Sequence, residues 1–366
     1  MKRATGLSLA LILVLISSIV FAQDPANFNT SLHKTRAGKA YWYGQANGGF
    51  ETLTNIPIDT LGCMKCHPAT YADGSQVDVA TYEPGCNDCH DFVNKGTTVE
   101  DAQCLQCHGR QATEINKMHL ADVHRDMGFK CTDCHTKKEM HGDGHSYNSL
   151  LEAGAMEVQC ENCHNDVEPS PSHLIHKDEL ECSTCHVQTV ITCYNCHFES
   201  LVEGKVKRAA GGLKGYMLLV RKEDTGKVSP ATFMAMTYQG KAFYAVAPFY
   251  SHSVQKEGKQ CTDCHGSNAV KAIQNGDPIK LATWDDTNHK VLPYNGVVPV
   301  TSDWQNIFQF DFLSYSGDVA GDTDPTKWSV LKTNADLSQM LFAQPLTAED
   351  MEKLSSPIAD TFPTSL

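Results

Sequence analysis

Residues 182–197 read CSTCHVQTVITCYNCH, and this stretch indicates what kind of protein the chain is. It holds two copies of Cys-x-x-Cys-His, separated only by residues 187–192. The pattern is typical of covalent c-type haem attachment, in which both cysteine sulfurs bond to the haem and the histidine binds its iron. A linker of this length spans at most about 20 Å when extended. Two haems attached here must be close neighbours, which favours electron passage between irons over haem storage.

The same pattern occurs eight times and uses all 16 cysteines of the chain. The predicted attachment residues are Cys63 and Cys66, Cys86 and Cys89, Cys104 and Cys107, Cys131 and Cys134, Cys160 and Cys163, Cys182 and Cys185, Cys193 and Cys196, and Cys261 and Cys264. The predicted proximal iron ligands are His67, His90, His108, His135, His164, His186, His197 and His265. Four-cysteine zinc sites or a disulfide scaffold would also use every cysteine, but neither explains the histidine after each motif. We therefore predict eight covalently attached haem c groups, each with its iron.

Histidines outside the motifs are the candidate ligands for the other face of each iron. There are nine, because the chain has 17 histidines and eight lie in motifs. The predicted distal ligands are His33, His119, His124, His141, His145, His173, His176 and His252, which leaves His289 as the spare. A filled sixth position gives a low-spin electron-transfer haem, whereas an open position gives a haem that binds substrate. The supply of histidines therefore predicts mostly bis-histidine haems of low potential.

Several of these histidines lie close to a motif. His124 precedes Cys131 by seven residues, and His176 precedes Cys182 by six. His173 and His176 are three residues apart, so on a helix they share a face and one helix could serve two irons.

The N-terminal segment indicates export. Residues 1–22 carry the basic residues Lys2 and Arg3 near their start, continue with a short apolar run and end in a small residue. This order is typical of a signal peptide. A retained anchor is the alternative, but a membrane span needs about 20 apolar residues. We expect an exported protein, periplasmic or extracellular, with no membrane span in the mature chain. The formal net charge of −13 argues against nucleic acid as a partner.

The chain divides into three parts after the signal peptide. Residues 23–197 carry seven motifs, and this density predicts a haem-cored domain of mostly short helices and loops. Residues 198–260 contain no motif, and their strand-like runs between turn signals predict a small antiparallel β insertion. Residues 261–366 hold the eighth motif and a haem-free, mixed C-terminal tail, with a late helix expected from Thr347. The predicted fold class is a multihaem cytochrome c.

An exported chain with seven crowded motifs and an eighth set apart resembles the octahaem cytochromes c. That group includes octahaem tetrathionate reductase and the hydroxylamine oxidoreductase-like proteins, and it grades into the multihaem cytochromes of extracellular electron transfer. The resemblance covers about residues 33–265 and implies haem attachment at each motif with histidines as further ligands. In multihaem enzymes a Cys-x-x-Cys-Lys motif often marks the catalytic haem. This chain has no such motif, so no catalytic residue is assigned.

Two functional hypotheses follow. The first is an exported octahaem cytochrome that passes electrons along closely packed bis-histidine haems to a terminal acceptor or partner cytochrome. The alternative is a multihaem oxidoreductase that acts on a small nitrogen or sulfur species, such as nitrite, hydroxylamine or tetrathionate, at one five-coordinate haem near the loop 141–145. An electron-transfer protein is favoured over a reductase. The expected partners are donor and acceptor cytochromes or a reductase. A homo-oligomer or filament that exchanges a histidine such as His33 between subunits is compatible with the sequence.

Overall fold

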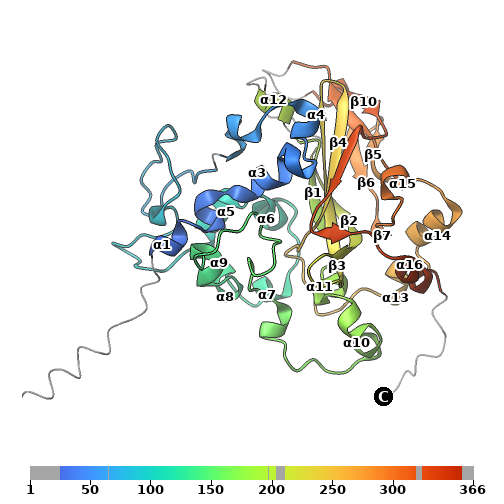
Figure 1. Ribbon diagram of the computed structural model, residues 1–366, viewed down its shortest axis with the longest axis horizontal. Helices are drawn as coiled ribbons and strands as arrows, with labels where there is room; N and C mark the ends of the chain where they lie inside the picture. The colour runs from blue at the N-terminus through green and yellow to red at the C-terminus, as the bar shows by residue number, and fades with distance from the viewer. Residues whose placement is uncertain (1–24, 65, 197, 203–210, 319–323, 357–366) are drawn as a thin grey trace, which may run out of the picture.

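The computed structural model describes residues 25–64, 66–196, 198–202, 211–318 and 324–356. Short helices and loops from the N-terminal half lie on one side of the molecule, and a twisted β-sheet lies on the other (Figure 1). The predicted signal peptide and His197 are outside the described residues, as is the side chain of Cys63. Within the described ranges, no helix has the length and apolar character that a membrane crossing requires.

The N-terminal region consists of short helical elements joined by loops. Its α-helices are α1 (Pro25–Phe28), α2 (Leu32–Thr35), α3 (Ala37–Tyr43), α4 (Glu51–Thr54), α5 (Asp101–Cys107), α6 (Gly109–Ala112), α7 (Val123–Asp126), α8 (Cys131–Cys134), α9 (Lys137–His141), α10 (Pro171–His176) and α11 (Cys182–His186). Its tighter 3-10 turns are η1 (Gln45–Asn47), η2 (Ile58–Thr60), η3 (Gly62–Met64), η4 (Cys86–Asp88), η6 (Cys160–Asn162) and η7 (Lys177–Glu179), and η5 (Thr113–Lys117) is a π-turn. Isolated helices shorter than about 12 residues are marginal in water, so these elements depend on what they pack against.

The main sheet has seven strands. Its strands are β1 (Val190–Tyr194), β2 (Gly211–Lys222), β3 (Val228–Tyr238), β4 (Lys241–Pro248), β7 (Gly296–Pro299), β11 (Leu337–Met340) and β12 (Ala343–Gln344). The order β1-β2-β3-β4 is antiparallel throughout, β11 joins β4 in parallel, and β7 and β12 pair with β2. Gln239 and Gly240, with φ of 47° and 78°, make the tight turn between β3 and β4. Two residues with positive φ match the twist of a two-residue hairpin.

Smaller elements complete the C-terminal half. The strands β6 (Lys290–Pro293), β5 (Ile279–Asp285) and β8 (Phe308–Phe310) form one sheet, and β10 (Trp328–Lys332) pairs with β9 (Phe312–Tyr315). The helical elements are α12 (Phe198–Val202), α13 (Cys261–Cys264), α14 (Asn268–Asn275), α15 (Trp304–Ile307), η8 (Pro325–Lys327) and α16 (Ala348–Ser355). The predicted late helix is confirmed as α16, which Thr347 caps by accepting a hydrogen bond from the Asp350 amide.

The hydrophobic core lies on the sheet. Tyr194, Tyr216, Phe233 and Phe310 are each at most 1% exposed there. A smaller cluster joins α4 to β3 and β4 through Phe50, which packs on Phe198 and on Phe243 of β4.

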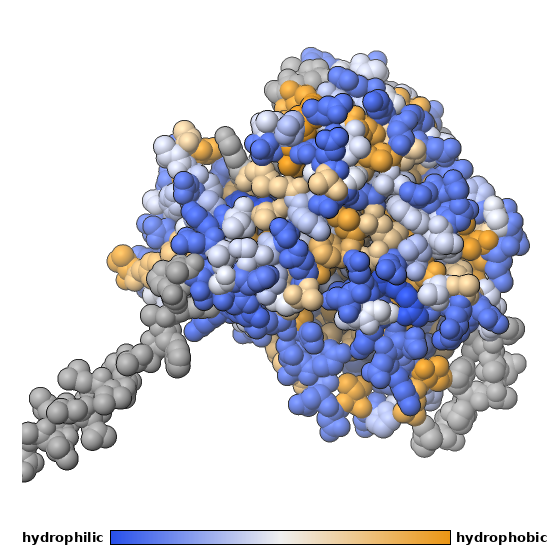
Figure 2. Space-filling model, viewed as in Figure 1, coloured by the Kyte–Doolittle hydropathy of each residue, from blue (hydrophilic) through white to orange (hydrophobic). Residues whose placement is uncertain are grey.

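Between residues 59 and 186, few apolar side chains are buried, in contrast to the sheet. The buried hydrophobic residues of this region are Leu120, Leu151 and Ala155. Twelve large hydrophobic side chains are exposed in the described part of the chain, and ten of them lie there: Val79, Phe92, Val93, Met127, Phe129, Leu150, Val158, Val167, Leu174 and Ile175. Figure 2 shows hydrophobic surface in patches over the N-terminal region and along its seam with the sheet. The apolar side chains of this region therefore have too few protein partners to form a core.

The predicted β insertion is part of a larger structure. Its three expected strands are present as β2, β3 and β4, but the sheet also takes β1 from before residue 198 and β7, β11 and β12 from after residue 260. It is mixed rather than purely antiparallel. The physical reason is that nearly every residue of β3 is buried, so both faces of this strand need covering by other parts of the chain.

Candidate haem-binding sites

We number the sites first to eighth in the order of their motifs along the chain. Seven of the motifs each begin on a short helical element of their own. These elements are η3, η4, α5, α8, η6, α11 and α13. In the second, third, fourth, fifth and eighth motifs the histidine amide donates to the carbonyl of the first cysteine at 2.8–3.0 Å. Such a turn places two cysteines that are three residues apart on one face. The seventh motif differs, because Cys193 lies in β1 and Cys196 follows that strand.

None of the 15 cysteines with described side chains forms a disulfide. The close group of three metal-ligating side chains that the described residues form is Cys160, Glu161 and Cys182. This group is not the four-cysteine set that the zinc alternative requires.

Six motif histidines each face a histidine from outside the motifs. The pairs, with the distance between ring centroids, are His33 and His108 (6.0 Å), His90 and His141 (6.0 Å), His124 and His164 (6.0 Å), His135 and His252 (6.4 Å), His173 and His186 (6.2 Å), and His176 and His265 (6.2 Å). Each pair combines one predicted proximal ligand with one predicted distal ligand. The narrow range of distances indicates a common spacer between the rings.

The ring separation fits one metal ion held between two imidazoles. Bonds from a metal to an imidazole nitrogen are about 2 Å long, and that nitrogen lies about 1.2 Å from the ring centre. Two rings on opposite sides of one ion are therefore about 6.4 Å apart, centre to centre. Direct ring stacking would bring the rings closer, as for Tyr43 and Phe50 at 4.6 Å. The six pairs thus have the spacing of axial ligands on one iron.

The other histidines that the structure describes are not seen in such pairs with a described motif histidine. Within the described part of the chain, the ring that lies near His67 is that of Tyr82, at 5.8 Å between centroids, and no histidine ring faces it. His145 packs on Tyr147, and His289, the predicted spare, lies near Trp284. His119 has an unusual backbone φ of 49°, and its neighbour Met118 lies beside Gly212, the strand partner of Cys193. His119 therefore lies near the seventh motif, whose own His197 is outside the described residues.

Burial favours the neutral form of several paired imidazoles. It lowers the pKa of His108 to about 4, and the charges of His33 and His135 add to this effect. Burial also lowers the pKa of His33, His90 and His141. Neutral imidazole is the form that binds a metal, so these rings are suited to ligation at neutral pH.

Backbone carbonyls orient five of the imidazoles. A carbonyl oxygen lies 2.9–3.1 Å from Nδ1 of each, in the pairs His67 with Pro68, His173 with Glu168, His176 with Ser172, His186 with Gln255 and His265 with Lys353. Because a carbonyl only accepts, Nδ1 carries the proton and Nε2 keeps its lone pair for a metal.

Two other imidazoles have a carboxylate oxygen within hydrogen-bond distance of Nδ1, which the sequence did not reveal. Nδ1 of His135 lies 2.8 Å from Glu139 Oε2, and Nδ1 of His252 lies 3.1 Å from Glu114 Oε2. The spacing of four residues from His135 to Glu139 was a usable signal, since such residues are neighbours on a helix. Glu114 gave no signal, because 138 residues separate it from His252.

The first cysteines of successive motifs meet in two places. A hydrogen bond between Cys104 and Cys131 lowers the pKa of Cys104 and raises that of Cys131, so the third and fourth motifs are in contact. The same interaction joins Cys160 to Cys182, which brings the fifth and sixth motifs together.

Cysteines of further motifs lie close enough to interact electrostatically without a hydrogen bond between them. Burial is the main cause of a raised pKa at Cys89, Cys107, Cys134 and Cys264, and a nearby cysteine of another motif raises each further. The neighbours are Cys89 with Cys104, Cys107 with Cys66, Cys134 with Cys163, and Cys264 with Cys185. The motifs are therefore neighbours in the order second, third, fourth, fifth, sixth and eighth, with the first beside the third.

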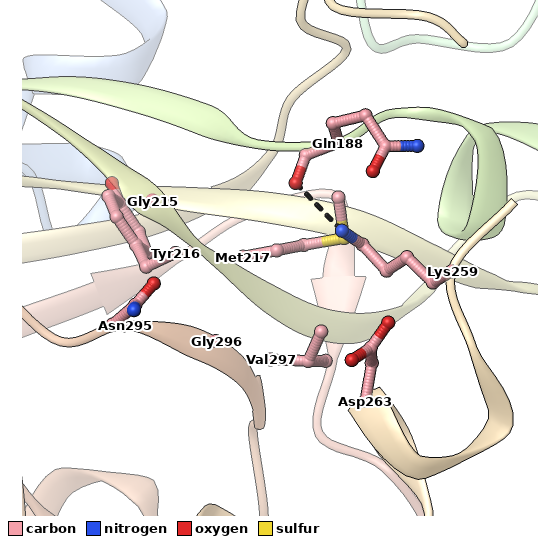
Figure 3. Close-up of a pocket in the computed structure, with 9 residues that line it drawn as sticks. All are labelled: Gln188, Gly215, Tyr216, Met217, Lys259, Asp263, Asn295, Gly296 and Val297. Carbon is pink, nitrogen blue, oxygen red and sulfur yellow. Dashed lines mark hydrogen bonds between the residues drawn. The ribbon is translucent and has the colours of Figure 1, made fainter. Parts of the chain in front are cut away.

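A cavity of about 200 Å³ lies between the sheet and the eighth motif (Figure 3). Its wall includes Tyr216 and Met217 of β2, Val297 of β7, and the charged side chains of Lys259 and Asp263. The Lys259 ammonium donates to the Gln188 carbonyl at 2.7 Å. Burial lowers the pKa of Lys259, while the adjacent Cys264 and Asp263 oppose this shift. A cation thus stands between the sixth and eighth motifs, where it can pair with a carboxylate of a bound group.

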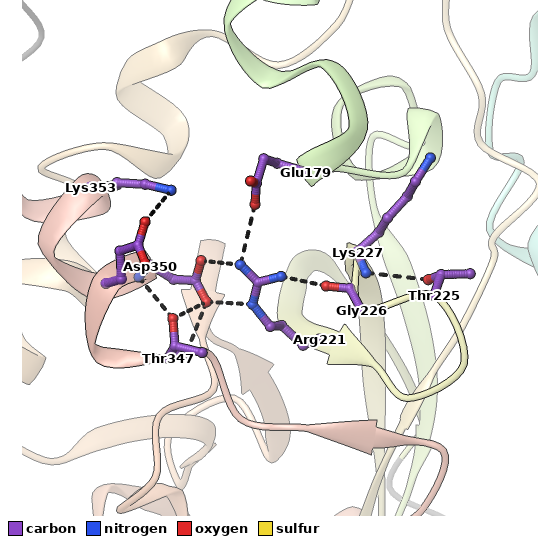
Figure 4. Close-up of polar contacts among 9 residues, drawn as sticks. Glu179, Arg221, Thr225, Gly226, Lys227, Thr347, Asp350 and Lys353 are labelled. Carbon is purple, nitrogen blue, oxygen red and sulfur yellow. Dashed lines mark hydrogen bonds and ion pairs between the residues drawn. The ribbon is translucent and has the colours of Figure 1, made fainter.

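The C-terminal helix α16 fixes the eighth motif. Arg221 of β2 forms two hydrogen bonds to Asp350, at 2.5 and 2.7 Å, and a longer ion pair to Glu179 at 3.4 Å (Figure 4). The helix held in this way supplies the Lys353 carbonyl to His265 and the Leu354 carbonyl to the Gly266 amide. The tail therefore orients a motif that lies 88 residues earlier in the chain.

Comparison with known proteins bears on the first three motifs. The family of cytochrome c7 and related cytochrome c matches residues 50–109. No curated protein matches the chain. Among solved structures, the octaheme cytochrome c from Shewanella oneidensis matches with a TM-score of 0.34 and 13% identity, over 57% of this chain and 77% of that chain.

The family match and the motif geometry agree on the cofactor. The matched segment holds three Cys-x-x-Cys-His motifs, at Cys63–His67, Cys86–His90 and Cys104–His108. Cytochromes of this kind carry covalently bound haem c with its iron and transfer electrons to redox partners. Residues 50–109 are therefore similar to the multihaem c-type cytochromes, and the same Cys-x-x-Cys-His pattern continues through the chain to residue 265.

Proposed function

We propose that the protein is an exported octahaem cytochrome that passes electrons along closely packed bis-histidine haems to a terminal acceptor or partner cytochrome. The observation that carries the proposal is the set of six histidine pairs with centroids 6.0–6.4 Å apart. A pair of imidazoles on one iron gives a low-spin haem with no open position. Such haems are suited to electron transfer rather than to substrate binding.

The residues have distinct parts in this function. Haem c supplies one-electron chemistry at its iron when it is bound. The motif cysteines would hold each haem covalently, and the paired histidines would fill both axial positions at six sites. Helix α10 contributes His173 to the sixth site and His176 to the eighth, so one element serves two sites. The backbone carbonyls at Nδ1 keep the rings in the tautomer that binds iron.

The cysteine contacts support a continuous route. The order second, third, fourth, fifth, sixth and eighth gives each of these sites a neighbour before and after it, except at the two ends. We propose that redox partners, either cytochromes or a reductase, exchange electrons at those ends. His33 faces His108 of its own chain, so an exchange of histidines between subunits in a filament would need a residue other than His33.

Electron paramagnetic resonance of the oxidised protein tests the proposal, with haem content measured alongside. We expect eight haems per chain and low-spin signals for at least the six paired sites. His252→Ala should convert one haem to a high-spin species, because it removes the ring opposite His135. His289→Ala is the matched control and should leave the spectrum unchanged, since His289 faces no described motif histidine. A haem count well below eight, or high-spin signals at most sites, would contradict the proposal.

One observation favours a second candidate, a small-molecule oxidoreductase with its site at the first motif. Arg36 donates to the Tyr82 hydroxyl at 3.0 Å, and the Lys39 ammonium lies 2.9 Å from Cys66 Sγ. Two cations beside a motif histidine with no facing histidine in the described residues suit a small anion. His141 faces His90, so this candidate does not place the open position in the loop 141–145. A high-spin signal of about one haem that shifts on adding nitrite or tetrathionate would favour it.

A further inference from the structure

The fourth site differs from the sixth and eighth sites in what holds its imidazoles. Both rings of this site, His135 and His252, have a carboxylate oxygen at Nδ1, at 2.8 Å from Glu139 and 3.1 Å from Glu114. The sixth and eighth sites provide the comparison. Their four paired rings, His173, His186, His176 and His265, all have neutral backbone carbonyls at Nδ1.

The two carboxylates are built into the fold. The side chain of Glu114 is 0% exposed and that of Glu139 is 1% exposed. Glu139 Oε1 accepts hydrogen bonds from the amides of Glu157 and Val158, at 2.6 and 2.8 Å, while Oε2 faces His135. Both carboxylate oxygens of Glu139 therefore have partners inside the protein.

Glu114 reaches the site from a different element. It lies in the π-turn η5, and its Oε2 contacts both the backbone amide and Nδ1 of His252. Its Oε1 is buried without a hydrogen-bond partner. A buried carboxylate with so few partners depends on His252 for its stabilisation, so the interaction between the two is strong in both directions.

A carboxylate at Nδ1 alters the reduction potential of the metal ion that Nε2 of the same imidazole binds. It draws the Nδ1 proton towards itself, which makes the imidazole a more basic ligand. It also adds negative charge close to the iron, and this favours the ferric over the ferrous state. Both effects lower a reduction potential. Two carboxylates at one site, one on each face, act in the same direction.

We propose that Glu114 and Glu139 hold the haem of the fourth site at a lower reduction potential than the haems of the sixth and eighth sites. The proposal rests on the proposed function, because it requires His135 and His252 to share one iron. The fourth site stands between the third and the fifth, through Cys104 with Cys131 and Cys134 with Cys163. A potential below those of the sixth and eighth sites makes electron transfer from that end of the route to the fourth site thermodynamically unfavourable.

A redox titration of the holoprotein, followed by electron paramagnetic resonance at fixed pH, tests the proposal. In the wild-type protein the fourth haem should be reduced after the sixth and eighth. His252→Ala identifies its signal, since that variant turns the same haem high-spin. In the double variant Glu114→Gln and Glu139→Gln, the ratio of reduced to oxidised haem at this site should rise about tenfold or more, and tenfold is about 59 mV for one electron. The low-spin signal should remain, with shifted g values.

The controls separate charge from packing. Glu157→Gln removes a carboxylate from the residue whose backbone amide donates to Glu139. The Glu157 side chain itself bonds to Thr136 and Lys138 rather than to an imidazole. This variant should leave the titration unchanged, whereas each single Glu→Gln variant at Glu114 or Glu139 should give part of the shift. A double variant that titrates like the wild type would overturn the inference. So would a wild-type fourth haem that is reduced before the sixth and eighth, even if the variants fail to fold. Absence of low-spin haems altogether would instead contradict the proposed function.

Discussion

The sheet region and the motif-bearing region differ in how each treats its apolar side chains. From residue 187 onward they pack on one another, and Phe233 and Phe310 of the main core are fully buried. Between residues 59 and 186 the pattern is reversed, with Phe92 54% exposed and Val93 91% exposed. Exposed apolar surface on this scale indicates a missing partner. The difference suggests that the sheet folds on its own core, whereas the motif-bearing region needs its haems to become stable.

The two regions nevertheless meet at the sites. His252 follows β4 of the sheet and faces His135 in the motif-bearing region. Helix α16, held on the sheet by Arg221, orients His265. The sheet region thus supplies fixed points for a region that lacks a core of its own. This division of roles can be tested by disturbing each region separately.

Haem removal should have the largest effect, and only on one region. In a chain produced without haem attachment, we expect amides between residues 59 and 186 to exchange with free energies near zero. The strands β2, β3 and β4 should keep their protection, because their core is made of protein side chains alone. Hydrogen exchange measured by mass spectrometry would show the contrast. Equal loss of protection in both regions would contradict the comparison and would make the sheet depend on haem as well.

Phe233→Ala should destabilise the sheet region rather than the motif-bearing region. Phe233 is 0% exposed and packs on Tyr216 and Phe310 with centroids 5.0 Å away in each case. Removing such a ring costs about 3–5 kcal/mol of the free energy of unfolding. Phe92→Ala is the matched control and should change that free energy by less than about 0.5 kcal/mol in the haem-free chain. Chemical denaturation gives both values. A similar loss in both variants would remove the distinction between the regions.

The sequence indicated which histidines could be distal ligands, but it made no prediction of their pairing with the motifs. Each of the six histidines that face a motif histidine was expected as a distal ligand. Yet His124 lies just before the fourth motif and faces His164 of the fifth, and His176 lies just before the sixth and faces His265 of the eighth. A short loop cannot carry a side chain around a porphyrin to the opposite face of the same iron. The tertiary fold decides the pairing.

The same limit applies to the sheet. Runs of strand-forming residues predicted β2, β3 and β4, because consecutive antiparallel strands need only tight turns. The parallel pairings of β7 with β2 and of β11 with β4 join residues that lie far apart in the sequence. Local patterns do not encode such pairings, so the expected insertion was smaller than the sheet that forms.

Asp350→Asn should have the smallest effect of the three and should connect the two regions. Asp350 is buried and bonds to Arg221, so we expect a loss of about 1–3 kcal/mol. Burial alone would raise the pKa of Asp350, but Arg221 and Thr347 lower it overall. The stabilisation is therefore complete above the pKa of an unfolded aspartate and is lost as the pH falls through the lower folded value.

The variant should accordingly be less stable than the wild type near pH 7 and should lose less further stability on acidification. Glu349→Gln is its control, because the ion pair of Glu349 with Lys353 is exposed to solvent and contributes little to stability. Since α16 supplies the Lys353 carbonyl to His265, loosening this helix should also disturb the eighth haem. A shift confined to one haem signal in Asp350→Asn, absent in Glu349→Gln, would show that the sheet region acts on a haem site through its C-terminal helix. Unchanged haem signals in both variants would mean that α16 stabilises the sheet without setting the geometry of the eighth site.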